Sequence, residues 1–246
     1  MPGPDTNRGA KRAREARERL GLGAGGPVGC VLTLVEERAG VPVVVATLPD
    51  RIAGACWRAG GRTVLWVNGA QALVRRRFTL AHELGHVCCG HEAPAVDTPH
   101  TLSAAARDPQ EVQANAFAAE LLAPRAGVEA ELAGGEPALD DVVRIAARFG
   151  ISAPAALNRC RTLGLVRPAR AARLEREIEE GLAGYLAPPP LDDALARIRD
   201  LPRLSPALQG SALAAVLRGE ASVDAAARAA GCAADVLADA AAAMSA

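Results

Sequence analysis

The segment His82-Glu83-Leu84-Gly85-His86 has residue types and spacing that could do chemistry. Histidines four residues apart project from one face of a helix, where their imidazole nitrogens can bind a single zinc ion. Glu83 lies about a quarter of a turn away, so its carboxylate can reach a water on the metal rather than the metal itself. The pattern predicts that His82 and His86 hold one Zn²⁺ ion and that Glu83 is the catalytic base of a hydrolase.

Residues 72–89 contain no proline and predict the helix that such a site requires. The apolar residues of this helix form one narrow stripe, made of Leu73, Leu80, Leu84 and Val87. His82 and His86 lie nearly opposite the stripe, so we expect one face to pack in the core and the other to face a cleft. Gly85 costs a helix about 1 kcal/mol relative to alanine, which indicates that another backbone segment passes close to it.

A zinc site with one position open for water needs a third protein ligand. The spacing H-E-x-x-H-x-x-G-x-x-H does not provide it, because Gly90 and His91 are each out of place by one residue. We expect His91 and His100 to be surface histidines, with stabilisation of an oxyanion as the alternative. For Cys89, on the face of His86, a small buried hydrophobic residue is favoured over a thiolate that binds or blocks the metal.

A later stretch, DPQEVQANAFAAELLAP, predicts a second helix that begins after an Asp108 cap and ends before Pro124. Glu111 and Asn115 lie on one face of this helix. Glu111 could bind the metal, and Asn115 could orient one of the metal ligands without binding the metal itself. Close approach to the first helix would be allowed by two small residues, Ala114 and Ala118. The second helix is therefore the expected source of the third ligand.

RRRFTLAHELGHVCCGH and EVQANAFAAELLAP together resemble the ImmA/IrrE family of bacterial and phage-borne zinc metallopeptidases. The resemblance covers about residues 28–166 and implies a gluzincin-like endopeptidase with Glu111 as the third zinc ligand. Family members cleave a helix-turn-helix repressor and so switch on stress-response or mobile-element genes, which implies a regulatory protein as the substrate. One departure is Cys88-Cys89, where the family usually has bulky aliphatic residues.

The sequence predicts an α+β fold that is mainly helical, because alanine dominates and β-branched residues cluster early in the chain. Residues 28–40 predict a helix, VPVVVATL a buried strand, and the runs on either side of Ala59-Gly60-Gly61 a β-hairpin. The resemblance implies that this small sheet and the H-E-x-x-H helix form a zincin-like core. Further helices are expected at about 138–149, 153–163 and 168–186, and an all-α region follows.

Four segments are expected along the chain. They are a flexible N-terminal arm (1–27), the peptidase domain (28–166), a connecting helix with a proline-rich linker (167–190) and a small helical C-terminal module (191–246). The last boundary follows from Pro188, Pro189 and Pro190, because three successive prolines cannot continue a helix.

The charges of the chain balance, with 28 basic and 28 acidic residues, so no overall field draws it to nucleic acid or to an anionic membrane. Two helix pairs, around Gly150 and Gly231, have a helix-turn-helix outline. Reading bases needs Arg, Lys, Asn or Gln on the second helix. The last pair instead offers Ala233, Ala234, Asp235 and Asp239. Direct nucleic-acid binding is not expected, and the C-terminal helices are candidates for protein docking or for a homodimer.

The N-terminus carries charge where a signal peptide needs an apolar stretch, and the six cysteines show no C-x-x-C spacing. The longest near-apolar stretch, Val41 to Leu48, is far short of the ~20 residues of a membrane-spanning helix. We therefore expect a cytoplasmic protein without a membrane partner. Two alternatives to an enzyme remain. One is a DNA-associated regulator or protein-binding module with a structural or dormant zinc site, and the other is a toxin–antitoxin or phage-element partner that acts by binding alone.

Overall fold

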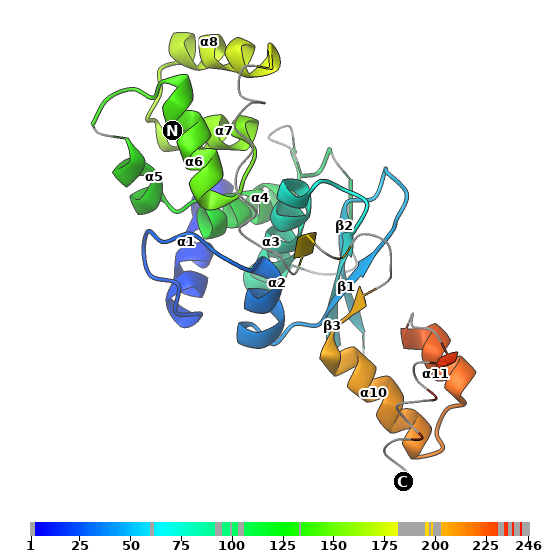
Figure 1. Cartoon of the computed structure of the whole chain (residues 1–246). Coiled ribbons are helices and arrows are strands. Elements are labelled where there is room, and N and C mark those ends of the chain that lie inside the picture. The colour runs from blue at the N-terminus through cyan, green and yellow to red at the C-terminus, as the bar shows by residue number, and fades with distance from the viewer. Residues whose placement is uncertain are drawn as a thin grey trace.

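The computed structural model describes residues 3–59, 62–91, 95–98, 100–102, 106–132, 134–181, 195–196, 198, 203–230, 234–235, 238 and 242. These residues form a mainly helical fold with one small sheet (Figure 1). Its helices include α1 (Pro4–Arg19), α2 (Val31–Thr33), the π-helix η1 (Leu34–Arg38), α3 (Leu73–Cys89), α4 (Pro109–Leu122), α5 (Arg125–Glu131), α6 (Leu139–Phe149), α7 (Ala153–Leu163), α8 (Pro168–Glu179), α10 (Pro206–Leu217) and α11 (Val223–Ala230). Its strands are β1 (Val43–Ala46), β2 (Gly54–Ala59), β3 (Arg62–Asn68), β4 (Ala95–Asp97) and β5 (Arg203–Leu204).

The sheet has the strand order β4-β2-β3-β1-β5. Strands β2 and β3 form the predicted antiparallel hairpin, with Trp57 opposite Val64, and β1 runs parallel to β3. Two short edge strands, β4 and β5, pair antiparallel to β2 and β1. The sequence did not predict these edges, because strands of two or three residues are too short to show a period of two.

Helix α3 lies at the centre of the fold and packs against β2, β3 and α4. Side chains alternate across a strand, so Leu65 and Val67 of β3 are buried in the main core with Leu80 and Leu84 of α3. The opposite face of the sheet is covered in part by α10. The helix that carries the H-E-x-x-H motif therefore packs against its neighbours through other faces as well as through its apolar stripe.

The prediction of a flexible N-terminal arm is wrong between Pro4 and Arg19, which form helix α1 against α4. A Cβ atom on Gly9 would lie 2.1 Å from the carbonyl oxygen of Gln113, so the two backbones are in direct contact there. Ala13 and Ala16 are fully buried on the same side. Their small side chains form a narrow contact stripe. This stripe was not predicted from the sequence because most of the surrounding residues are charged.

Buried arginines join separate segments to the central helices. Arg17 donates hydrogen bonds to the carbonyl oxygens of Leu121 and Gly26. Arg77 of α3 donates to the carbonyls of Gly29 and Gly150, over 2.6 and 3.1 Å. Because backbone carbonyls are strong acceptors that need partners when buried, each arginine fixes the path of a loop. Arg76 of α3 has the same kind of bonds, to the carbonyls of Leu195 and Ile198.

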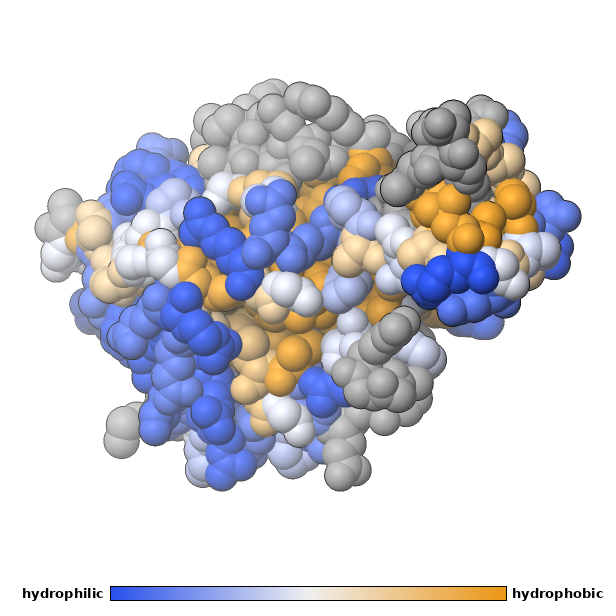
Figure 2. Space-filling model, turned by 90° about the horizontal axis from the view of Figure 1, so that it is seen from below, coloured by the Kyte–Doolittle hydropathy of each residue, from blue (hydrophilic) through white to orange (hydrophobic). Residues whose placement is uncertain are grey.

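The C-terminal region joins the sheet rather than standing apart from it. Strand β5 pairs with β1, and Arg203 forms a two-bond ion pair with Glu36 of η1, at 2.5 and 2.6 Å. Beyond β5, α10 and α11 pack on each other, and apolar residues gather on this lobe at the right of Figure 2. The predicted Pro188–Pro190 linker, and most of the second helix of the last helix pair, lie outside the described residues.

Among the described residues, no helix combines the length and the apolar character that crossing a bilayer demands.

The buried ion pair between Arg159 and Glu120 generates a stability prediction. Both side chains are buried, and Arg159 also donates to the carbonyl of Ala123 over 2.8 Å. Replacing Arg159 with Met should lower the free energy of unfolding by about 3–5 kcal/mol, because a buried carboxylate loses its main partner. Urea unfolding measures this. The matched control, Arg12→Met in the exposed pair with Glu15, should cost about 0–1 kcal/mol, and equal losses would contradict the prediction.

Candidate metal centre

The site is built where α3 and α4 come closest together. A Cβ atom on Gly85 would lie 3.1 Å from Cδ1 of Phe117 and 3.2 Å from both Cα and the carbonyl oxygen of Ala114. Any larger residue at position 85 would crowd α4, and the close backbone approach expected from Gly85 is confirmed. Asp108 caps α4 by accepting hydrogen bonds from the backbone amides of Gln110 and Glu111. The cap places Glu111 in the first turn of α4.

Three donor residues converge between the two helices. The Nε2 atoms of His82 and His86 are 2.9 Å apart, and the Glu111 carboxylate oxygens lie 3.3 Å from His82 Nε2 and 3.6 Å from His86 Nε2. Ligand atoms on a tetrahedral zinc ion with bonds of about 2.0–2.1 Å would be roughly 3.3–3.4 Å apart. Two imidazoles and a carboxylate at this spacing fit zinc and leave its fourth position for water.

The histidines are more deeply buried than the sequence indicated. His82 and Glu83 are 0% exposed and His86 is 2% exposed, whereas the Glu111 side chain retains 13% exposure. The expectation that their face of α3 lines an open cleft is therefore wrong. Helix α4 and strand β2 both pack against α3 and enclose this face. Of the three donor residues, Glu111 is the most accessible to solvent.

Asn115 fixes the orientation of His82. Its Oδ1 atom lies 3.0 Å from His82 Nδ1, and its Nδ2 group donates to the carbonyl of Thr101 over 2.8 Å. Because the amide nitrogen is used in that bond, Oδ1 must accept, which places the His82 proton on Nδ1. The lone pair of His82 is then on Nε2, the atom that faces His86 and Glu111. The orienting role expected for Asn115 agrees with this geometry.

A second hydrogen-bonded chain fixes His86, and the sequence did not predict it. His91 Nδ1 lies 2.9 Å from His86 Nδ1, His91 Nε2 lies 3.3 Å from Gln113 Oε1, and Gln113 Nε2 donates to Asp5 Oδ1 over 2.8 Å. Because Asp5 Oδ1 accepts the hydrogen bond from Gln113 Nε2, Gln113 Oε1 is the acceptor for His91 Nε2–H. His91 Nδ1 then accepts from His86 Nδ1–H, which leaves the lone pair of His86 on Nε2, the atom that faces His82 and Glu111.

His91 is thus not the surface histidine that we expected. It is 7% exposed, and burial lowers the pKa of its imidazole, so it stays neutral at pH 7 with one donor and one acceptor nitrogen. The signal that could have found it is its spacing, five residues after His86 and just beyond the left-handed Gly90 that ends α3. His100 is exposed, as expected.

Glu83 lies against strand β2 at a position where only glycine fits. A Cβ atom on Gly54 would be 2.7 Å from Glu83 Oε1, 2.5 Å from Cγ2 of Thr79 and 2.8 Å from the carbonyl oxygen of Trp66. Gly54 therefore allows the strand to pass directly beside the carboxylate. A glycine inside a predicted strand often marks such a close approach. Gly54 was therefore the sequence signal for the contact between the strand and Glu83.

Cys89 does not belong to the cluster of donor atoms. Burial, which acts most strongly, and the neighbouring Cys88 raise the pKa of its thiol to about 11, so the thiolate is scarce near neutral pH. The small-hydrophobe interpretation of Cys89 agrees with its packing at the edge of the main core.

Breaking the second chain should weaken metal binding. Gln113→Leu removes the acceptor of His91 Nε2–H, and the loss of such an outer hydrogen bond typically lowers metal affinity about 10–100-fold. Competition with a zinc chelator of known affinity would measure the change. The control is Gln110→Leu, whose side chain is exposed on the same helix and which should bind zinc as the wild type does. An unchanged zinc affinity in Gln113→Leu would contradict the prediction.

The comparisons with known proteins agree with this geometry. No curated protein matches the sequence. One family model matches residues 36–161, a range that runs from η1 into α7 and includes all the donor residues. Its description is Peptidase_M78, IrrE N-terminal-like domain, which confirms the family resemblance of the two motifs. Because the match spans just over half of the 246 residues, the chain belongs to this family of IrrE-like metallopeptidases.

Proposed function

We propose that this protein is a zinc-dependent endopeptidase that cleaves one specific regulatory protein, a helix-turn-helix repressor of stress-response or mobile-element genes. The observation that carries the proposal is the convergence of His82, His86 and Glu111 with Glu83 on the same helix turn. The family match supports peptide hydrolysis. The repressor substrate, the cytoplasmic location and a homodimer through the C-terminal helices rest on the sequence-based expectations.

Each residue of the site has a defined task in this proposal. His82, His86 and Glu111 would hold one zinc ion, which when bound supplies a Lewis acid that polarises a peptide carbonyl and acidifies a water. Glu83 would accept a proton from a water molecule as the water oxygen adds to the peptide carbonyl carbon, and would deliver that proton to the amine nitrogen as the C–N bond breaks. The two hydrogen-bonded chains keep the Nε2 atoms of both histidines directed at one point. Burial of Glu83 excludes bulk water and strengthens its electrostatic interactions.

Metal content tests the proposed ligands. Purified wild-type protein should contain about one zinc ion per chain after dialysis, and both His82→Ala and Glu111→Ala should lose most of it, because two remaining ligands bind zinc weakly. Elemental mass spectrometry measures the ratio of zinc to protein. His100→Ala, an exposed histidine outside the donor cluster, is the control and should keep its zinc. Zinc retained by Glu111→Ala would overturn that ligand.

Activity tests the role of Glu83. Glu83→Gln keeps the size of the side chain but cannot accept the proton, so cleavage should slow by about 10²–10⁴-fold while zinc content stays at the wild-type level. The measurement compares new N-termini by mass spectrometry after wild-type and variant proteins are incubated with proteins of the source cell. New termini in a helix-turn-helix repressor with wild-type protein alone would support the proposal. Equal patterns would favour a binding module with a dormant zinc site.

A further inference from the structure

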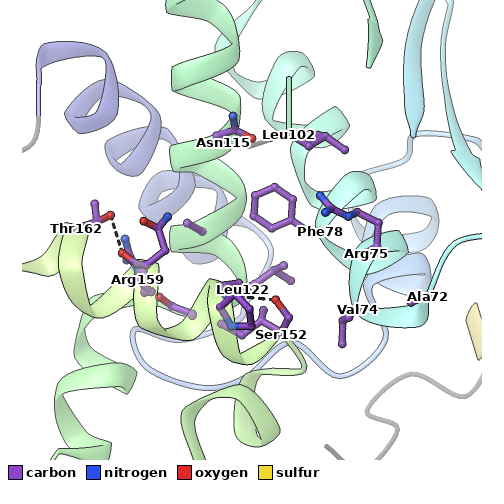
Figure 3. A pocket seen from close by; sticks show the side chains of 16 residues that line it. Ala72, Val74, Arg75, Phe78, Leu102, Asn115, Leu122, Ser152, Arg159 and Thr162 are labelled. Atoms are coloured by element: carbon purple, nitrogen blue, oxygen red, sulfur yellow. Dashed lines mark hydrogen bonds between the residues drawn. The ribbon is translucent and has the colours of Figure 1, made fainter. Parts of the chain in front are cut away.

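Thr79 places a buried hydroxyl group on the side of α3 that faces strand β2. Its side chain is 0% exposed, and within the described part of the chain its Oγ1 atom makes no hydrogen bond. Successive residues of a helix point about 100° apart. The preceding residue, Phe78, therefore projects elsewhere, into a cavity of about 520 Å³ between α3, α4 and α7 (Figure 3). A buried hydroxyl without a partner is unfavourable, so the presence of threonine here needs a physical reason.

The proposed base lies next to the methyl group of this threonine. Thr79 precedes Glu83 by four residues, so both side chains lie on one face of α3. A Cβ atom on Gly54 would lie 2.5 Å from Thr79 Cγ2 and 2.7 Å from Glu83 Oε1. The methyl group and the carboxylate oxygen are therefore no more than about 5 Å apart, and residue 54 places no side chain between them.

Rotation about one bond exchanges the methyl group for the hydroxyl group. Threonine in a helix populates two χ1 rotamers, and a rotation of about 120° moves Oγ1 to the position that Cγ2 holds. A hydroxyl oxygen is smaller than a methyl group, so the exchange does not crowd Gly54. Two acceptors then lie near the hydroxyl, the Glu83 carboxylate and the carbonyl oxygen of Trp66, which is 2.8 Å from the same Cβ position. The carboxylate is favoured, because hydrogen bonds to ionised acceptors are stronger than those to neutral ones.

We propose that Thr79 is a positioning residue for Glu83, whose carboxylate accepts a hydrogen bond from the Thr79 hydroxyl. The inference rests on the proposed peptidase function and adds a residue to its machinery. A glutamate side chain has several rotatable bonds, and fixing them costs conformational entropy. A hydrogen bond to one carboxylate oxygen reduces this freedom before the substrate arrives and leaves the other oxygen to accept a proton. Thr79 thus acts through Glu83 and touches no substrate itself.

The first test measures the affinity of zinc-loaded full-length protein for acetohydroxamic acid by NMR titration. This probe gives up a proton when it chelates zinc, and Glu83 is placed to accept that proton, so the dissociation constant depends on Glu83. Thr79→Val keeps the shape of the side chain and should weaken probe binding about tenfold, as expected for the loss of a hydrogen bond to a charged group. Zinc content should not change. Thr79→Ser keeps the hydroxyl and should stay within about twofold of the wild type.

A double-mutant cycle identifies the acceptor. In a Glu83→Met background, which has no acceptor at position 83, Thr79→Val should change the dissociation constant by less than about twofold. A full tenfold loss in that background would assign the hydroxyl to the carbonyl of Trp66 and overturn the proposal. The control is Thr162→Val on α7. The Thr162 hydroxyl donates to the carbonyl of Asn158 on its own helix (Figure 3), so this variant should bind the probe as the wild type does.

A second measurement needs neither probe nor variant. Three-bond couplings from Thr79 Cγ2 to its backbone nitrogen and carbonyl carbon report χ1 in the zinc-loaded wild type, which should differ by about 120° from χ1 in the structure. An unrotated Thr79, or wild-type probe affinity in Thr79→Val, overturns the positioning role and leaves the peptidase proposal standing. If Glu83→Met alone binds the probe as tightly as the wild type, the proposed role of Glu83 fails and that of Thr79 fails with it. Thermal unfolding checks that each variant is folded.

Discussion

The close contact between α3 and α4 is the constraint on which the other features of this protein depend. Gly85 and Ala114 allow the two backbones to meet almost without intervening side chains. At this separation the Glu111 carboxylate, in the first turn of α4, lies 3.3 and 3.6 Å from the two imidazoles on α3. A Cβ atom at position 85 would lie 3.1–3.2 Å from Phe117 and Ala114, so even alanine would press the two helices apart there. Stability and donor geometry are therefore determined by the same contact.

The donor residues are held by hydrogen-bonded chains that run outward in two directions. One chain ends at the backbone carbonyl of Thr101, and the other passes through His91 and Gln113 to Asp5 of α1. Both chains select the tautomer that leaves Nε2 directed at the centre. An N-terminal helix that appears to be a charged appendage in the sequence thus takes part in orienting a residue of the site. A metal centre of this kind needs such support, because imidazole rings rotate easily without an outer partner.

Segments distant in the sequence are joined to this centre by buried arginine side chains. Arg17 donates to the carbonyl of Gly26, Arg77 to that of Val28 and Arg76 to that of Ile198, in non-helical segments on either side of the central part of the chain. Each guanidinium has five donors in a fixed plane, so one residue can fix several carbonyls at once. In a protein with few aromatic residues, these contacts supplement a core made largely of alanine and aliphatic side chains. Strand β5 and the pair between Arg203 and Glu36 extend the same arrangement to the C-terminal region.

The sequence by itself determined those features that rest on local spacing. The limits of α3 and α4, the hairpin, the donors on one helix and the significance of Gly85 all follow from periodicity and turn chemistry. The resemblance of two motifs indicated Glu111 and the family. Tertiary structure alone decided the packing of α1, the edge strands, the burial of the histidines and the link from Gln113 to Asp5. Each of these depends on contacts between residues far apart in the chain, and local spacing carries no information about such contacts.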